Sequence, residues 1–355
     1  MAKPYSNEIY AFQQTNPAPP SGRLASADLL KVVAIFSVVF IHGSAVIPVT
    51  HSSSHINRSD IVTATTGLRF CVPVFIFLWA YFMEKSILKR GNDHIKPRLY
   101  KLLVPFGFWS MVYFIITADI AHLTIGTVIS KHWSGYGWSG QYYFIILFQL
   151  LLLFPYLRKI IPAASKVVPW IYLAGLTFYI CVSYSGWFGI STVAKLSDRL
   201  FFYWLPYVIL GVIYAHKSIF KFSLPLWIGI FSVALVPAEL YFLEPQQISL
   251  YVLPSVFVCS MVLISSMERG LSYSQLPFWL GTVIEYLANY TLGIFCLNPL
   301  IILGLHVIFG KVDLAVGFPG APIMTSLLST GLIICLCVLI ISLLKKVKLG
   351  FLVSN

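Results

Sequence analysis

The chain has 355 residues, of which 58% are hydrophobic and only 10% are charged, and its formal net charge is +12. Soluble globular domains carry about 25% charged residues, so this composition excludes a soluble protein and indicates a polytopic membrane protein. The positive charge does not indicate a nucleic-acid partner, because the lysines and arginines gather in short segments that flank apolar runs.

The chain divides into one long apolar domain with a polar segment before it. Residues 1–25 are polar, carry several prolines and lack the apolar core of a cleavable signal peptide. We expect a disordered cytoplasmic tail over 1–25, a single membrane domain over 26–345 and a short cytoplasmic tail over 346–355.

Apolar runs long enough to cross a bilayer as helices recur along this domain. They cover residues 29–49, 61–82, 101–121, 141–157, 167–184, 200–216, 223–242, 247–266, 286–309 and 322–344. We therefore predict an all-α fold of about ten transmembrane helices.

Lysine and arginine orient these helices. With the N-terminus in the cytoplasm, all 24 of them fall in inner segments except Arg58, Arg69, Lys131, Lys195, Arg199 and Lys311. Because this bias recurs at each inner loop, the sequence predicts that both termini are cytoplasmic. The inner loop after the second run is the richest in charge, which suits either simple anchoring or the binding of lipid or ligand phosphates.

Several chemistries are disfavoured by motifs that the sequence lacks. The six cysteines lie within apolar runs at spacings unlike those of metal sites, so we expect no metal. The signatures of P-loop and dinucleotide binding, of zinc proteases and of serine hydrolases are also missing. No role is assigned to the acidic residues near span ends, Glu239 and Glu285.

Two ionisable side chains interrupt the first two apolar runs. His42 lies roughly 20 Å along an outward helix that starts at Leu29, and Arg69 lies roughly 12 Å into the returning helix from Ile61. These depths nearly coincide, in the outer half of a core of about 30 Å. A charge buried in hydrocarbon costs about 2.5–3.5 kcal/mol or more, so such residues are usually functional. His42 suits a general base and Arg69 an oxyanion or carboxylate ligand, although both also suit structural pairing.

Further polar residues lie at useful depths. We expect Ser26 to cap the first helix, with Asp28 in its first turn and Lys31 one turn further on, at the inner surface. Asn298 lies roughly 18 Å along the run that starts at residue 286, near the depth of His42. An ordinary capped helix start, a snorkelling lysine and a helix-packing amide are the alternative interpretations.

Together these segments resemble the membrane-bound acyltransferase-3 family, whose members O-acylate cell-surface and exported polysaccharides. The resemblance covers residues 23–345. It rests on Asp28, Lys31 and His42, on Arg69, Pro73, Phe75 and Phe77, on Arg98 and Lys101, on Gln141, Tyr142, Tyr143, Phe144 and Pro155, and on Asn298 and Pro299. The chain departs from the family pattern where Lys31 and Lys101 replace arginine, where Trp79-Ala80-Tyr81 replaces Ser-Gly-Tyr, and where Asn298 replaces a common histidine.

The resemblance implies an O-acyltransferase of the bacterial inner membrane, most simply an O-acetyltransferase that acts on an exopolysaccharide or its lipid-linked precursor. It implies acetyl-CoA or another acyl-CoA as donor substrate, with no bound cofactor. The expected partners are this donor, the sugar acceptor, membrane lipids and other polysaccharide-synthesis proteins, without nucleic acid. It also implies catalysis by His42 and Arg69, and donor or substrate contacts by Lys31, Arg98, Lys101, Asp28, Asn298 and Tyr143.

Two other functions remain open from the sequence. A transporter of a polysaccharide precursor or small acid would use His42 and Arg69 as substrate and proton sites, although we find no internal repeat. A non-catalytic subunit of a polysaccharide synthase would keep its activity after the loss of His42.

Overall fold

The computed structural model describes residues 23–44, 49–50, 55–91, 95–117, 124–133, 137–161, 167–185, 199–216, 223–243, 248–309, 314–315 and 321–353. The predicted N-terminal tail lies almost wholly outside these ranges. Within them the regular structure is helical, apart from two short parallel strands, β1 (Val49–Thr50) and β2 (Leu314–Ala315). The predicted helical class is confirmed.

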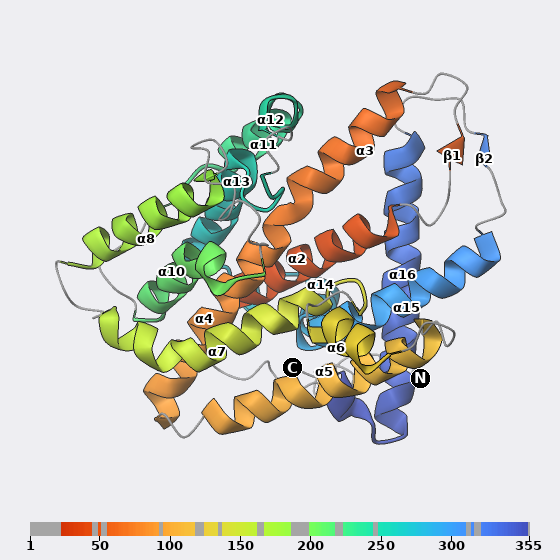
Figure 1. Ribbon diagram of the computed structural model, residues 1–355, viewed down its shortest axis with the longest axis horizontal. Helices are drawn as coiled ribbons and strands as arrows, with labels where there is room; N and C mark the ends of the chain where they lie inside the picture. Colours follow the sequence, from red (N-terminus) through yellow and green to blue (C-terminus); the bar gives the residue numbers. More distant parts are fainter. Residues whose placement is uncertain are drawn as a thin grey trace, which may run out of the picture.

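A helix or a group of helices overlaps each predicted span (Figure 1). They are α2 (Ala25–Gly43), α3 (His55–Gly67) with η1 (Leu68–Phe70) and α4 (Cys71–Arg90), α5 (Ile95–Thr117), α7 (Gln141–Ile160), α8 (Val168–Ser183), η5 (Phe201–Trp204) with α10 (Leu205–Ala215), α11 (Leu226–Ala234) with α12 (Val236–Leu243), α13 (Pro254–Ser265), α14 (Phe278–Asn289) with α15 (Thr291–Phe309), and α16 (Ala321–Lys346). Shorter elements are α6 (Ile125–Trp133), η7 (Ser266–Arg269), η8 (Tyr273–Gln275) and η9 (Gly350–Leu352).

Not every predicted span is matched by a helix of full length. Among the described residues, 6 helices are long and apolar enough to cross a membrane, and the bent pair α11–α12 would make 7. The ninth predicted span is divided at Tyr290, between α14 and α15. The structure therefore supports a multi-pass membrane protein, while the count of ten and the side of each terminus stay predictions.

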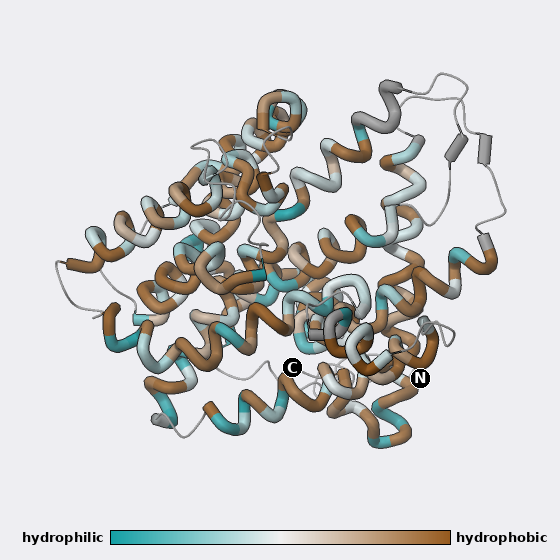
Figure 2. The backbone as a smooth tube through the Cα atoms, in the orientation of Figure 1, coloured by the Kyte–Doolittle hydropathy of each residue, from teal (hydrophilic) through white to brown (hydrophobic). Residues whose placement is uncertain are grey.

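Hydrophobic residues occur along helices at the edge of the bundle as well as at its centre (Figure 2). Large exposed hydrophobic residues come from α5, α8, α11, α12, α15 and α16, and include Ile115, Trp170, Ile230, Tyr241, Val307 and Leu328. Water disfavours a surface of this kind, whereas lipid tails do not, so these faces suit a bilayer.

Helices α2 and α4 form the centre of the bundle (Figure 1). Helix α2 contacts α4, α14, α15 and α16, and α4 also contacts α10 and α13. Helix α8 packs on α10, α11 packs on α13, and α5 packs on α7. His42 therefore lies on a central helix and Arg69 in the 3₁₀ turn that leads into the other, and η1 itself contacts α2, α3 and α13.

An ion-pair network joins α4, α7 and α10. Glu84 is 1% exposed, and Arg158 donates Nε and Nη2 to its two carboxylate oxygens at 3.0 Å each. Nε2 of His216 lies 3.0 Å from Oε1 of the same carboxylate. A carboxylate buried here without partners would cost several kcal/mol, so this network compensates its burial.

The start of the first helix differs from the prediction. The helix begins at Ala25, and the N–H of Asp28 donates to the Leu24 carbonyl at 3.2 Å, so Leu24 occupies the cap position. Ser26 lies inside the helix, and its buried hydroxyl has no partner among the described residues. The expected Ser26 cap is therefore wrong, because the first turn closes two residues earlier.

The end of the first helix also differs, because it lies at Gly43 and not at residue 49. Helix α16 approaches so closely here that a Cβ on Gly43 would lie 2.7 Å from Cδ1 of Ile333. The Ser44 hydroxyl donates to the Ile41 carbonyl at 3.1 Å and satisfies one of the end carbonyls. His42 consequently lies in the last turn of α2.

The chain after α16 packs onto the bundle as far as the structure describes it. Leu352 and Val353 are buried, and Nε1 of Trp109 in α5 donates to the Leu352 carbonyl at 3.2 Å. This part of the predicted C-terminal tail is thereby fixed against α5.

We expect Gly211→Ala to destabilise the contact between α10 and α4. An added Cβ would lie 2.6 Å from the Phe77 carbonyl oxygen and 3.0 Å from the Tyr81 nitrogen, and these backbone atoms cannot rotate away. Overpacking of this kind lowers the free energy of unfolding by about 1–3 kcal/mol. Thermal unfolding in detergent measures the effect. Gly331→Ala is the matched control, since nothing lies within 4 Å of its added Cβ, and equal midpoints for the two variants would contradict the prediction.

Candidate active site

Prolines shape the backbone at two places in the centre of the bundle. Proline has no N–H, and its ring displaces the carbonyl four residues earlier. Pro73 is the third residue of α4, and Arg69 lies in the 3₁₀ turn that precedes this helix. Pro299 lies inside α15, so the Phe295 carbonyl loses its usual helical donor. In a membrane such a carbonyl needs another partner.

The side chain of Asn298 satisfies the carbonyl that Pro299 leaves free. Its Nδ2 donates to the Phe295 carbonyl at 2.7 Å and to the Ile294 carbonyl at 3.0 Å. Its amide oxygen lies 2.9 Å from Nδ1 of His42. An amide oxygen only accepts, so Nδ1 of His42 carries the proton and Nε2 keeps a free lone pair.

This arrangement gives His42 the form that a general base needs. A neutral imidazole whose one nitrogen donates to a fixed acceptor presents its other nitrogen in a defined direction. Asn298 is fully buried and His42 is half-buried, so packing fixes the acceptor.

Arg69 lies beside this pair. Its charge is within electrostatic range of His42, and its Cζ lies 4.8 Å from the ring centroid of Tyr251. Its buried Nε has no hydrogen-bond partner among the described residues. Arginine keeps its proton, so a free donor inside the bundle suits an oxygen atom that a ligand brings. The structure thus gathers His42, Arg69 and Asn298 at one place, as their depths predict.

A cavity of about 530 Å³ lies among α2, α4, α5, α7 and α15. Its cationic lining residues are Lys31, Lys85, Lys89, Arg90, Arg98 and Lys101. Its apolar and aromatic lining residues include Phe75, Leu78, Trp79, Phe82, Met83, Tyr143 and Phe295. No carboxylate is found among the described residues that line it.

The cationic lining residues gather toward one end of this cavity, where Lys31 Nζ lies 4.6 Å from the Phe82 ring centroid, and the contacting rings of Phe75, Tyr143 and Phe295 line the other end. Phe75 and Arg90 both lie on α4, where 15 residues separate them by roughly 22 Å along the helix. Lys31, Arg98 and Lys101 belong to the cationic group and Tyr143 to the aromatic group, so the structure places these four predicted residues in one cavity. The shape and charge suit a long ligand with phosphates at one end.

Phe295 connects the cavity with the polar pair. It lines the cavity, its ring centroid lies 5.4 Å from that of Tyr143, and its carbonyl accepts the amide of Asn298. His42 itself is not a lining residue of the cavity. The aromatic end of the cavity, at Phe295, therefore lies about one helical turn from Asn298, which orients His42.

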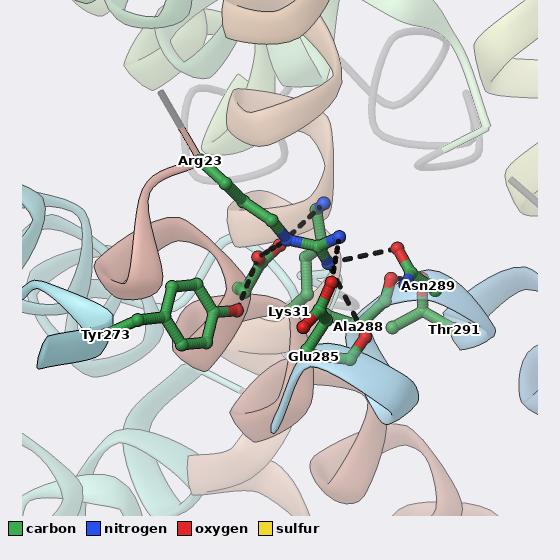
Figure 3. A network of polar contacts seen from close by, with 8 residues as sticks. Arg23, Lys31, Tyr273, Glu285, Ala288, Asn289 and Thr291 are labelled. Carbon is green, nitrogen blue, oxygen red and sulfur yellow. Dashed lines mark hydrogen bonds and ion pairs between the residues drawn. The ribbon is translucent and has the colours of Figure 1, made fainter. Parts of the chain in front are cut away.

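Asp28 has a different place from the one predicted at the substrate. It is 2% exposed and is not a lining residue of the cavity. It accepts from Arg23 Nε, from Lys31 Nζ at 3.1 Å and from the Tyr273 hydroxyl at 2.8 Å (Figure 3). Asp28 therefore holds Lys31 at the edge of the cavity instead of facing the ligand.

Arg23 and Tyr273 complete this network (Figure 3). Arg23 also donates to Glu285 Oε1 at 3.2 Å and to Asn289 Oδ1 at 2.9 Å. Burial opposes its charge, but the bond to Asp28 prevails and raises the pKa of Arg23. Burial, followed by the bond to Asp28, raises the pKa of the Tyr273 hydroxyl, which stays a donor. Arg23 lies five residues before Asp28, so the sequence could have predicted this ion pair. Nothing in the sequence marks Tyr273 as a partner of Asp28.

The comparison with known families agrees with the geometry. Residues 24–342 match the model of the Acyl_transf_3 family, described as an acyltransferase domain. The chain therefore belongs to this acyltransferase family, as its motifs predict, and its apolar helices make it a multi-pass membrane protein. No curated protein and no solved structure matches the chain significantly.

We expect Asn298→Leu to lower the rate of acyl transfer while leaving the binding of the acyl donor unchanged. The substitution keeps the side-chain volume but removes the acceptor that fixes His42, and it also removes the amide donor to the Phe295 carbonyl, so rates are compared at equal amounts of folded protein. General-base catalysis contributes roughly 10²–10⁴-fold in rate, so a His42 that has lost its orienting partner should lose roughly tenfold or more. Initial rates and donor binding in membranes with matched protein amounts measure the two effects. An unchanged rate, or an equal loss of donor binding, would contradict the proposed orientation of His42.

Proposed function

We propose that the protein is an O-acetyltransferase of the bacterial inner membrane that transfers an acetyl group from acetyl-CoA to a hydroxyl of an exopolysaccharide or its lipid-linked precursor. The observation that carries this proposal is the cavity with one cationic and one aromatic end. Phe295 lines its aromatic end. The Phe295 carbonyl accepts a hydrogen bond from Asn298, and Asn298 in turn contacts His42. Family membership supports acyl transfer in general.

The cationic end of the cavity suits the phosphates of coenzyme A. Arg98 offers a planar fork of donors for a phosphate, whereas Lys31 and Lys101 act as compact charges. Lys31 and His42 are 11 residues apart on α2, roughly 16 Å along the helix. The extended thioester arm of the donor covers this distance, past Tyr143 and Phe295.

The transfer then follows from the state of His42. Nε2 accepts the proton of the acceptor hydroxyl, and the hydroxyl oxygen attacks the carbonyl carbon of the thioester. The carbonyl oxygen becomes an oxyanion, to which Arg69 donates. The carbon–sulfur bond breaks as the carbonyl re-forms, and the leaving thiolate takes the proton from the imidazolium. The products are the sugar ester and free coenzyme A, and His42 returns to its neutral form.

Membranes supplied with labelled acetyl-CoA test this function. We expect label to reach the glycan in wild type, His42→Ala to lower the rate by roughly 10²–10⁴-fold and Arg69→Ala by roughly 10²–10³-fold. Normal incorporation in His42→Ala would contradict the catalytic role and favour a non-catalytic subunit. A wild type that moves a solute across the membrane but never labels the glycan would favour a transporter.

The donor site has its own test. We expect Arg98→Ala and Lys101→Ala to raise the KM for acetyl-CoA by roughly tenfold each, because each removes a charge-assisted contact with a phosphate. Lys96→Ala is the matched control, since Lys96 is exposed on the same helix but does not line the cavity. Steady-state kinetics at fixed ionic strength measure the change. An equal KM for all three variants would contradict the proposal that this end of the cavity binds the phosphates.

A further inference from the structure

Arg69 is held in an unusual way for an arginine inside a membrane bundle. No carboxylate among the described residues pairs with it, and the ring of Tyr251 lies 4.8 Å from its Cζ. An aromatic face attracts the cation through its quadrupole and does not use up the N–H donors as a carboxylate would. The contact therefore fixes the guanidinium while its donors stay available.

The ring that holds Arg69 is itself fixed from two sides. The Tyr142 hydroxyl donates to the Tyr251 hydroxyl at 2.6 Å. The ring of Trp204 meets the Tyr251 ring edge-on, with centroids 6.0 Å apart and planes at 65°. Aromatic rings packed in this geometry have few alternative rotamers, so Tyr251 offers Arg69 a rigid surface.

The backbone that carries Tyr251 is pinned as well. Tyr251 lies in the turn before α13, where the Val252 N–H donates to the Ser249 carbonyl at 3.0 Å and the Val252 carbonyl accepts the Tyr184 hydroxyl at 3.0 Å. Just beyond the turn, Glu239 accepts the N–H of Ser255 at 2.8 Å and also its hydroxyl. These bonds give Glu239 a structural role at the start of α13.

We infer that Tyr251 is the positioning residue for Arg69, and that its aromatic ring sets the guanidinium where the thioester oxygen becomes an oxyanion. This inference rests on the proposed acyl transfer and names a residue that acts through Arg69 without touching the donor. A displaced oxyanion donor loses most of its effect, because its stabilisation depends on preorganised geometry. The ring of Tyr251 and not its hydroxyl carries this role.

Three substitutions distinguish the effect of losing the Tyr251 ring from the effect of losing its hydroxyl and from nonspecific destabilisation. Tyr251→Leu removes the ring, Tyr251→Phe keeps it, and Tyr241→Leu is a matched control at a tyrosine that is 78% exposed on α12. We expect Tyr251→Leu to lower kcat by roughly 100-fold, with the KM for acetyl-CoA changed by less than about twofold. We expect Tyr251→Phe to lose less than about tenfold, the worth of one neutral hydrogen bond.

Labelled acetyl transfer and binding of labelled acetyl-CoA, measured in the same membranes, decide the outcome. Loss of transfer in Tyr251→Leu alone, with donor binding intact, supports the inference. Three results would overturn it: full transfer in Tyr251→Leu, an equal loss in Tyr251→Phe, or a parallel loss of donor binding. Failure of the inference leaves wild-type transfer intact, whereas a wild type without transfer defeats the proposed function and the inference with it.

Discussion

The hydrogen bond between His42 and Asn298 depends on a rule of membrane structure, which is that buried backbone groups must find partners within the protein. Pro299 removes the helical donor for the Phe295 carbonyl, and the Asn298 amide replaces it at 2.7 Å. The amide oxygen then lies 2.9 Å from Nδ1 of His42. A defect in one helix thus determines the protonation pattern of an imidazole on another.

The cationic side chains of the site lie in two regions, and a different kind of partner holds them in each. At the cationic end of the cavity, the buried carboxylate of Asp28 holds Lys31, and Arg23 and Tyr273 hold Asp28 in turn. Arg69 lies instead against the ring of Tyr251. A carboxylate partner holds Lys31 at the edge of the cavity, whereas an aromatic partner leaves the donors of Arg69 open. Family membership supports acyl transfer, and we propose that the cationic end of the cavity binds the phosphates of the donor.

Sequence patterns predicted the helical class and the gathering of His42, Arg69 and Asn298, because depth along a membrane helix follows directly from residue count. They did not predict that α2 ends at Gly43, where α16 packs closely against it. The sequence also did not predict contacts between residues that are far apart along the chain. Tyr251 and Tyr273 reach their charged partners through tertiary packing, and no local pattern marks a tyrosine as the neighbour of a particular arginine or aspartate.

The protonation pattern of His42 tests the account most directly. Solid-state nitrogen NMR of protein labelled in its histidine rings, with the His42 signals identified by their loss in His42→Ala, distinguishes the two neutral tautomers. The account predicts a proton on Nδ1 and a bare Nε2 at neutral pH, because the Asn298 oxygen accepts from Nδ1. A proton on Nε2 with a bare Nδ1 would contradict it, since His42 would then present no base to an acceptor hydroxyl.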